Sequence, residues 1–196
     1  MNFEQLQKQV DFIHEIDKLK YIQRKTRLFN SNRTENDAEH SWHLALMAVV
    51  LAGHSNEAID LLKVIKMLLI HDIVEIDAGD VFLYDTVLNH TNTAAELAAA
   101  ERIFGLLPQH QAQELILIWE EFEAGETDEA KFARAMDRFE PLLQNQSNKG
   151  GTWAEFNVPY DKVVEKKSVI KNGSAILWDY AKKLIDSSVE EGILKK

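Results

Sequence analysis

Apolar residues recur at steps of three and four along most of the chain, the spacing that marks one face of an α-helix. The first run spans roughly five turns and contains Phe3, Leu6, Val10, Ile13 and Leu19. The periodicity is lost in RKTRLFNSNRTEND, where four cations gather with Asn and Ser. This composition predicts a loop after the first helix.

A second helix is expected from Ala38 to about Gly53, through the apolar residues Trp42, Leu46 and Val49. Ser55 can cap a third helix. The apolar face of this third helix carries Ile59, Leu62, Ile65, Leu68 and Leu69. The face leads into LLIHDIVE, where a histidine and an aspartate follow directly on apolar residues. Burying such an ionisable pair costs free energy unless a partner compensates it.

The second half of the chain also reads as helical. The stretch DAGDVFLYDTVLNHTNT is irregular, and further helices are expected at about 93–107, 108–125, 128–143, 158–171 and 174–188. Pro141 is expected to bend or end its helix, and QNQSNKGG reads as a polar loop. No repeat or alternating β pattern occurs, so the fold class predicted is all-α, an irregular multi-helix bundle in which residues 1–196 form one domain.

Composition narrows the function classes. The 196 residues are 45% hydrophobic, enough for one core, and the absence of Cys excludes disulfides, thiolate metal sites and a thiol nucleophile. A net charge of −10 disfavours a nucleic-acid polymer or an anionic lipid surface as partner. Because there is no long apolar run and MNFEQLQKQV is polar, we expect a cytoplasmic protein without a membrane span.

Histidines and carboxylates at four places could carry chemistry: His40, His71 with Asp72, Glu75, and Asp137. Two imidazoles and two carboxylates make a sensible set of ligands for a divalent first-row metal such as Mn, Co, Fe or Zn, whereas Mg usually prefers more oxygen. Glu75 follows His71 at i+4 and shares its face if the helix persists. His43 could replace His40, and any single histidine could equally be a surface residue.

The pattern formed by His40, His71–Asp72 and Asp137 resembles the HD-domain metal-dependent phosphohydrolase superfamily. The segments RTENDAEHSWHLALMA, HDIVEIDAGD, EAKFARAMDRFEPLL and GTWAEF resemble its 5′-deoxynucleotidase branch. The similarity covers most of residues 15–160, with C-terminal helices at 158–190 expected to pack on this region. It implies an all-α fold and removal of phosphate from nucleoside or deoxynucleoside 5′-monophosphates by direct attack of water.

The resemblance also implies residue roles. His40, His71, Asp72 and Asp137 would hold one divalent metal ion, with Mn or Co favoured over Fe, Zn or Mg. Glu75 would orient or deprotonate the attacking water, and Asp80 would contact the substrate or assist proton transfer to the leaving oxygen. Relatives of this branch form homodimers, so a homodimer is expected.

The basic loop would meet the phosphate. Arg24 falls near the position of a phosphate-contacting arginine in relatives, with Arg27 and Arg33 as alternatives. In the deoxynucleotidase relatives a tryptophan that helps reject the ribose 2′-hydroxyl follows the arginine, but here Lys25 follows Arg24. Selectivity for deoxynucleotides is therefore left open.

Two rival interpretations remain. His90 and His110 lie between the HD pair and Asp137, as extra ligands do in dinuclear HD oxygenases and phosphodiesterases, although surface histidines would look the same. The chain could also be a non-catalytic nucleotide-binding module. Phe82 and Tyr84, which follow Asp80, are placed to meet a nucleobase. The tryptophans Trp42, Trp119, Trp153 and Trp178 read as core residues.

Overall fold

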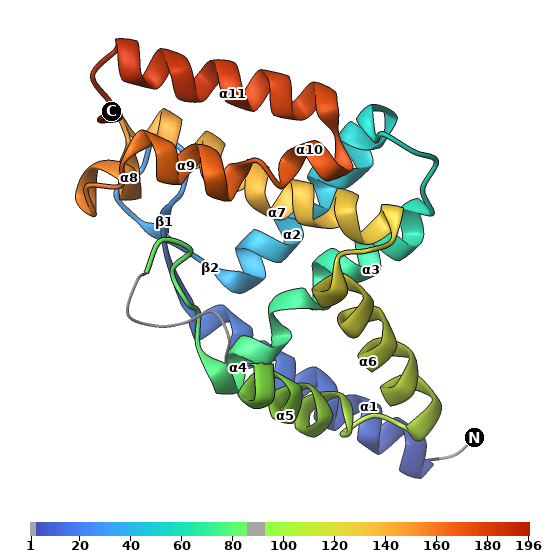
Figure 1. Cartoon of the computed structure of the whole chain (residues 1–196). Coiled ribbons are helices and arrows are strands. Elements are labelled where there is room, and N and C mark those ends of the chain that lie inside the picture. Colours follow the sequence, from blue (N-terminus) through green and yellow to red (C-terminus); the bar gives the residue numbers. More distant parts are fainter. Residues whose placement is uncertain (1–2, 86–92) are drawn as a thin grey trace.

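The computed structural model describes residues 3–85 and 93–196, and it consists almost entirely of helices (Figure 1). The α-helices are α1 (Phe3–Ile16), α2 (Asp37–Leu51), α3 (Leu61–Ile70), α4 (Glu75–Ala78), α5 (Thr93–Phe104), α6 (Gln109–Ala124), α7 (Asp128–Ser147), α8 (Gly151–Glu155), α9 (Tyr160–Lys167), α10 (Ile170–Gly173) and α11 (Ala175–Glu190). The 3-10 helices are η1 (Asp17–Tyr21), η2 (Ala52–His54) and η3 (His71–Val74). The prediction of an all-α bundle is confirmed, while the extent of the domain stays a prediction.

Helix α7 forms the centre of the bundle. It contacts α2, α3, α6, α10 and α11, and it lies between α11 and α3 in Figure 1. Its buried apolar residues include Phe132, Ala133, Ala135, Met136 and Leu142. Small and large side chains along one helix allow neighbours to approach closely while the gaps are filled. The central position of α7 means that any polar residue on its inner face is held rigidly.

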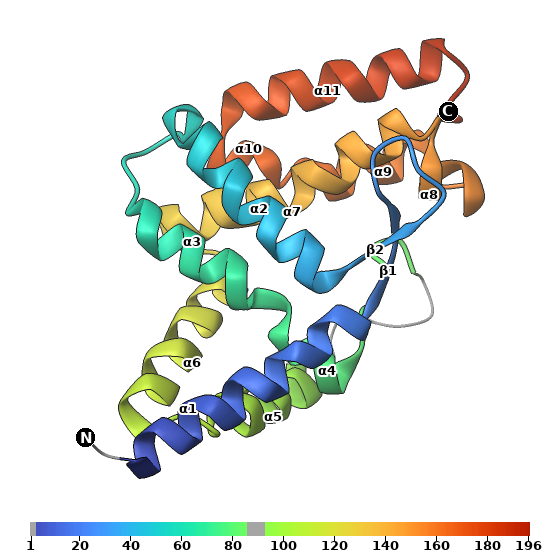
Figure 2. The same ribbon diagram turned by 180° about the vertical axis from the view of Figure 1, so that it is seen from behind.

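A second group of helices, α1 and α5, lies at the other end of the molecule and is joined to the middle by α6 (Figure 2). Helix α1 has no buried residue and contacts only η1 and α5 among the larger contacts of the described chain. The apolar periodicity of its sequence therefore predicted the helix correctly, but Leu19, in η1, is the one residue of that run that is buried.

Side-chain caps set several helix boundaries. Asn36 and Glu39 form a capping box at the start of α2, since the Asn36 side chain accepts from the Glu39 N–H and the Glu39 side chain accepts from the Asn36 N–H. Asp60 caps α3 by accepting from the N–H groups of the next turn. The prediction that Ser55 caps this helix is wrong, because the stronger acceptor lies five residues later. Gly125 ends α6 in the left-handed conformation at φ 64°, as expected of a C-terminal glycine.

The segment predicted as a basic loop is instead a small antiparallel hairpin of β1 (Gln23–Arg27) and β2 (Thr34–Asn36). Gln23 is paired with Asn36, and Arg27 with Thr34. The residues that the hairpin buries are Thr26 and Glu35, which are polar. A strand that buries polar side chains shows no apolar alternation, so the sequence pattern could not reveal it.

Two helix ends differ from expectation. Helix α7 continues through Pro141 to Ser147, so the proline neither ends the helix at that point nor begins the loop, and QNQSNKGG is mostly helical. A proline inside a helix removes its own N–H from the ladder and crowds the carbonyl four residues earlier, but the packing of α7 on many neighbours holds the helix together. The helix expected at 158–171 is divided into α9 and α10 at Ser168 and Val169.

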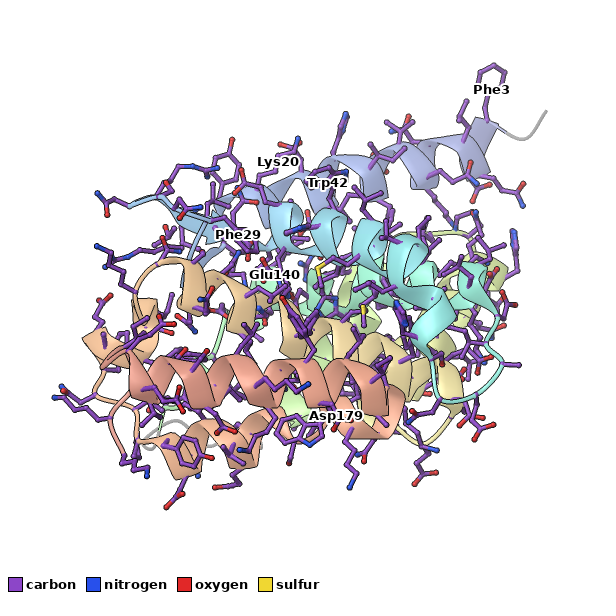
Figure 3. The ribbon with its side chains drawn as sticks, turned by 90° about the horizontal axis from the view of Figure 1, so that it is seen from above. Phe3, Lys20, Phe29, Trp42, Glu140 and Asp179 are labelled. Carbon is purple, nitrogen blue, oxygen red and sulfur yellow. The ribbon has the colours of Figure 1, made fainter. Side chains whose placement is uncertain are left out.

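One face of the molecule is more apolar than a solvent-facing surface requires. Trp42 is 63% exposed, and Leu46, Val49 and Val50 on the same helix are also exposed. Phe3 lies on the same edge of the molecule as Trp42 (Figure 3). The expectation that Trp42 belongs to the core is wrong, whereas Trp119 and Trp153 are buried. Within residues 3–85 and 93–196, no helix is long and apolar enough to cross a membrane.

Candidate metal centre and active-site cavity

Three separate helical elements bring His40, His71, Asp72 and Asp137 together. His40 comes from the first turn of α2, His71 and Asp72 from η3, and Asp137 from the middle of α7. His40 Nε2 lies 3.1 Å from Asp137 Oδ1, and His71 Nε2 lies 3.1 Å from Asp72 Oδ1. All four residues are buried. His40, His71 and Asp72 place donor atoms within 4.8 Å of one another, and Asp137 Oδ1 adjoins both histidine rings.

The proton on His71 has an assignable place. Nδ1 lies 3.0 Å from the Leu68 carbonyl oxygen, which can only accept a hydrogen bond, so Nδ1 carries the proton. Burial lowers the pKa of His71, which favours the neutral ring. Nε2 then presents a lone pair to Asp72 Oδ1 and, at 3.9 Å, to Asp137 Oδ1. A buried lone pair facing two carboxylates, with no hydrogen-bond donor, fits a position that receives a cation.

His40 is held from behind by two further carboxylates. Its Nδ1 lies 3.3 Å from Glu35 Oε2 and 3.4 Å from Glu140 Oε2, and both acids are fully buried. In Figure 3, Glu140 lies between α2 and α7. Burial opposes the charged form of His40, but the hydrogen bond with Asp137 and the nearby carboxylates of Glu140 and Glu35 outweigh it and raise its pKa well above the usual value. The surplus of negative charge around this ring favours a cation.

His43, the alternative to His40, lies elsewhere. Its Nδ1 faces Glu140 Oε1 at 3.3 Å from the outer side, and the ring is partly exposed. The structure therefore brings His40, and not His43, to His71 and Asp137. His43 instead connects the buried Glu140 carboxylate to the surface.

The chain changes from α-helix to 3-10 helix at His71, and this changes the position of Glu75. In a 3-10 helix, residues three apart lie above one another. Glu75 thus follows Asp72 at i+3, and the condition for its i+4 alignment with His71, a continuing α-helix, is not met. Asp37, Glu75 and Asp80 each place a carboxylate oxygen within 4.8 Å of the other two.

Arg24, from β1, enters this acidic group. Its Nη1 donates to Asp72 Oδ2 at 2.9 Å and to Asp37 Oδ1 at 3.3 Å. The same nitrogen lies 4.0 Å from Asp80 Oδ1. Although burial disfavours a charged guanidinium, the carboxylates Asp72, Asp80, Glu75 and Asp37 raise the pKa of Arg24. Arg24 is therefore fixed in its charged form.

The carboxylates of the site differ in their protonation. Burial alone would raise the pKa of Asp137, but Arg138 and His40 hold it well below its usual range, so Asp137 is ionised. Burial and Asp72 raise the pKa of Glu75 well above the usual range, and a hydrogen bond to Asp37 adds to this. Burial likewise raises the pKa of Asp80, and of Asp37 to about 6. Pairs of carboxylates with separated pKa values are typical of acid–base sites.

A cavity of about 500 Å³ opens in front of these residues and has Asp72, Glu75, Asp80 and Asp137 in its wall. Its walls also contain the cationic residues Arg24, Lys25, Arg134, Arg138, Lys166 and Lys167. The same wall contains Glu96, Glu123 and Glu165 as well, so its cations provide local positive charge for an anionic ligand without making the whole cavity basic.

Arg27 and Arg33, the alternative phosphate contacts, do not line the cavity. Arg27 Nη2 lies 2.9 Å from Glu155 Oε2, and Arg33 Nη2 lies 2.9 Å from Glu39 Oε1. Alternate residues of an extended strand point to opposite sides. Arg24 therefore points inwards, whereas Arg27, three residues further along β1, points to the other side. Arg33 lies in the segment that connects β1 to β2.

Residues 16–178 match the family described as HD domain. The chain belongs to the HD domain family. Its 5′-deoxynucleotidase HDDC2 relatives include the proteins of Mus musculus, 29% identical over 163 residues (80% of this chain and 79% of that protein), and of Bos taurus, 28% identical over 165 residues (81% and 78%). The resemblance drawn from the sequence motifs is confirmed.

Two solved structures are also similar to this HD domain. A crystal structure named as a predicted metal-dependent phosphohydrolase from Magnetospirillum magnetotacticum MS-1 is 49% identical with a TM-score of 0.94, and the match covers 98% of this chain and 97% of that one. The PH0347 protein from Pyrococcus horikoshii OT3 shares the fold, with a TM-score of 0.62 and 21% identity over 91% of this chain and 97% of that one.

The described residues place neither of the two histidines that suggested a dinuclear HD protein at the site. His90 lies outside the described residues. His110 is in the first turn of α6 and lines a separate surface hollow with Glu4, Lys8 and Gln113. The structure does not bring His110 to the metal centre of the HD domain.

Several residues at or near the candidate metal centre were not predicted from the sequence. They are Glu35, Asp37, Arg138, Glu140 and Lys167. Glu35 and Asp37 flank the cap of α2 and read as helix-start residues, while Glu140 lies one turn after Asp137. The i, i+3 spacing of Asp137 and Glu140 on an otherwise apolar helix face was the available signal.

Proposed function

We propose that this HD-domain protein is a metal-dependent phosphomonoesterase that hydrolyses nucleoside 5′-monophosphates to a nucleoside and phosphate. The observation that carries the proposal is the Nε2 lone pair of His71, buried and directed at Asp72 and Asp137 beside a cavity that Arg24 helps to line. The names of the HDDC2 relatives and of the Magnetospirillum structure support the same reaction class.

His40, His71, Asp72 and Asp137 are the proposed ligands of one divalent ion. The fit rests on the donor set, two imidazole nitrogens and two carboxylates, and on the unpartnered Nε2 of His71. A mixed nitrogen and oxygen set suits Mn, Co, Fe or Zn better than Mg, and we favour Mn or Co. When bound, such an ion polarises a phosphoryl oxygen and lowers the pKa of water.

Glu75 and Asp80 are the proposed acid–base residues. The carboxylate of Glu75 takes a proton from the attacking water as the bond from the water oxygen to phosphorus forms. Asp80, whose pKa is raised by burial, gives a proton to the leaving 5′ oxygen as its bond to phosphorus breaks. Burial and Asp72 raise the pKa of Glu75, which strengthens its carboxylate as a proton acceptor.

Arg24 is the proposed phosphate contact, and Arg27 and Arg33 are not, because their guanidinium groups pair outside the cavity. Phe82 and Tyr84 also line the cavity, and their rings lie 5.4 Å apart in an edge-to-face arrangement. Tyr84 is fixed by the Trp153 Nε1–H, which donates to its hydroxyl at 3.3 Å. We propose that this aromatic pair contacts the base or sugar of the nucleotide.

A phosphate-release assay tests the function. The protein is stripped of metal, reloaded with Mn²⁺ or Co²⁺, and offered ribo- and deoxynucleoside 5′-monophosphates, with 3′-monophosphates and a phosphodiester as controls. We expect release from 5′-monophosphates only. Protein that binds metal but releases phosphate from none of them overturns the proposal, and preferential cleavage of the diester favours a phosphodiesterase instead.

We also propose that the chain forms a cytoplasmic homodimer through the exposed apolar face of α2. Trp42, Leu46, Val49 and Val50 form this face, and apolar patches of this kind mark interfaces. Light scattering of Trp42→Glu is expected to show a monomer where the wild type is a dimer. Ile176→Glu, at an exposed apolar position on α11, is the matched control and should not change the mass. A monomeric wild type overturns this proposal.

A further inference from the structure

Arg138 pairs with Asp137, one of the proposed metal ligands, through the second oxygen of that carboxylate. Its Nη1 donates to Asp137 Oδ2 at 2.6 Å. The other oxygen, Oδ1, lies 3.1 Å from His40 Nε2 and 3.9 Å from His71 Nε2. One carboxylate therefore links the Arg138 guanidinium to the candidate metal centre, and Arg138, Asp137 and His71 border the same cavity.

Much of the Arg138 guanidinium is available to a ligand. In the part of the chain that the structure describes, Asp137 is its one hydrogen-bond acceptor. The Arg138 side chain is 27% exposed and lines the cavity. Arg24 differs, because its Nη1 donates to two carboxylates, those of Asp37 and Asp72. Of the two arginines, Arg138 therefore has the less compensated charge, and it keeps N–H donors for an anion.

A second cation, Lys167, adjoins Arg138 in the same wall of the cavity. Its side chain is buried, and its Nζ donates to a neutral acceptor, the Arg138 carbonyl oxygen, at 2.8 Å. Burial and the charge of Arg138 lower the pKa of Lys167 to about 7, although Asp137 and Glu140 oppose this shift. The two cations therefore repel each other, and an anion bound beside them in the cavity would reduce that repulsion.

We propose that Arg138 is a second phosphate-binding residue, which holds the nucleotide phosphate from the α7 wall of the cavity while Arg24 holds it from β1. The inference rests on the proposed function and adds a contact to the same phosphate from a different element. A guanidinium presents paired N–H donors that match phosphate geometry. In phosphoryl transfer the charge is spread over the equatorial oxygens of the transition state, where such donors stabilise it. Lys167 holds the backbone of Arg138 in place through its hydrogen bond.

Three variants separate phosphate binding from a role that only orients Asp137. Arg138→Gln removes the charge but keeps an amide N–H that can donate towards Asp137. Arg138→Lys keeps the charge without the planar fork of donors. Arg27→Gln is the matched control, because it removes the same charge from β1, where Arg27 pairs with Glu155 outside the cavity. An orienting role alone would change the affinity for Mn²⁺ and leave the affinity of the Mn²⁺-saturated protein for phosphate unchanged.

Titration calorimetry of each Mn²⁺-saturated protein with inorganic phosphate tests the inference. Losing hydrogen bonds to a charged group typically weakens binding about 10- to 100-fold, and we expect a loss in this range for Arg138→Gln. Arg138→Lys should recover part of the lost affinity, and Arg27→Gln should bind phosphate as the wild type does. An Arg138→Gln protein that binds phosphate like the wild type overturns the inference, as does an Arg138→Lys protein that recovers none of the affinity.

A measurement on the wild type decides the matter even if the Arg138 variants do not fold. Phenylglyoxal modifies accessible arginines, and mass spectrometry of the digested protein gives the extent of reaction at Arg138 and Arg27 separately. Inorganic phosphate should protect Arg138 and leave Arg27 reactive. An Arg138 that never reacts, or that reacts equally with and without phosphate, overturns the inference. Neither measurement depends on turnover, so phosphate binding through Arg138 in a protein that hydrolyses no nucleotide would contradict the proposed function alone.

Discussion

The two sides of the Asp72 carboxylate bury negative charge in different ways. On the histidine side, His71 Nε2 presents a lone pair and Asp137 a carboxylate oxygen to one space beside His40, and the compensating charge is an exchangeable ion in our proposal. On the arginine side, the compensating charge is Arg24, which is covalently part of the chain. The comparison teaches that one buried carboxylate can face histidine nitrogen on one side and a guanidinium on the other.

The largest effect on metal binding and activity is expected when a residue on the histidine side of Asp72 is removed. Asp137→Ala and His71→Ala each remove a proposed ligand, so both metal binding and activity should be abolished. At an Mn²⁺ concentration of 100 times Kd, binding to the native state stabilises it by about 2.7 kcal/mol. Thermal melts with and without Mn²⁺ should show this stabilisation in the wild type and not in either variant. Metal-dependent stabilisation that survives in both variants contradicts the ligand assignment.

Glu75→Ala should separate binding from chemistry. Because Glu75 lies on the arginine side and is not a proposed ligand, metal content should stay at the wild-type level. Loss of a general base typically lowers the rate about 10²- to 10⁴-fold, and we expect kcat to fall within this range. Glu57→Ala, at an exposed position, is the matched control. Full activity of Glu75→Ala would show that its assigned role is wrong.

Glu140→Gln tests how far the histidine side extends. Residues that hold a ligating histidine from behind typically contribute about 10- to 100-fold to metal affinity. Since Glu35 remains beside His40 Nδ1, we expect a loss near the lower end of that range. Titration calorimetry with Mn²⁺ measures it. His43→Ala removes the outer partner of Glu140 only, and an equal loss there would show that the effect does not pass through His40.

The smallest effect concerns Lys167, a buried lysine that hydrogen-bonds to a backbone carbonyl. Lys167 is 1% exposed, and its Nζ donates to the Arg138 carbonyl at 2.8 Å. Burial and Arg138 lower the pKa of Lys167 to about 7. The unfolded chain then binds more protons than the native state between this value and the ordinary lysine pKa, so native stability should rise with pH from 7 to 9, by about 1 kcal/mol per unit.

Denaturant unfolding at pH 7, 8 and 9 checks this last expectation. Lys167→Met removes the titrating group, so the stability difference between the wild type and this variant should shift in favour of the wild type as pH rises. Lys166→Met, at the neighbouring position, should leave the wild-type pH dependence unchanged. A wild type and Lys167→Met that respond alike to pH would show that Lys167 does not titrate in this range.

The helices and the four ligand candidates could be predicted because both leave local marks in the sequence. Periodic apolar residues revealed the helices, and paired polar residues in apolar surroundings revealed His71–Asp72 and Asp137. The hairpin could not be predicted, since it buries Thr26 and Glu35 instead of alternating apolar residues. The exposed face of α2 could not be predicted either, because its apolar side chains look the same in sequence as core residues.

The rest of the site depends on contacts between distant segments. Arg24, Arg27 and Arg33 are equivalent in a basic loop, and only the strand that contains Arg24 directs one of them towards Asp72. Glu35 and Glu140 acquire their place behind His40 only when β2, α2 and α7 meet. The switch to a 3-10 helix at His71, which aligns Glu75 with Asp72, likewise left no signal that periodicity could detect.

The central position of α7 has a consequence for the order of assembly during synthesis. The proposed ligands before Asp137 all leave the ribosome while α7 is still incomplete, and the helices that pack on the far side of α7 come later still. A nascent chain ending before α7 can form the α2–α3 pair but cannot close the ligand set. With the proposed ligands, metal binding would therefore come late in the synthesis of each chain, after α2, η3 and α7 have packed together.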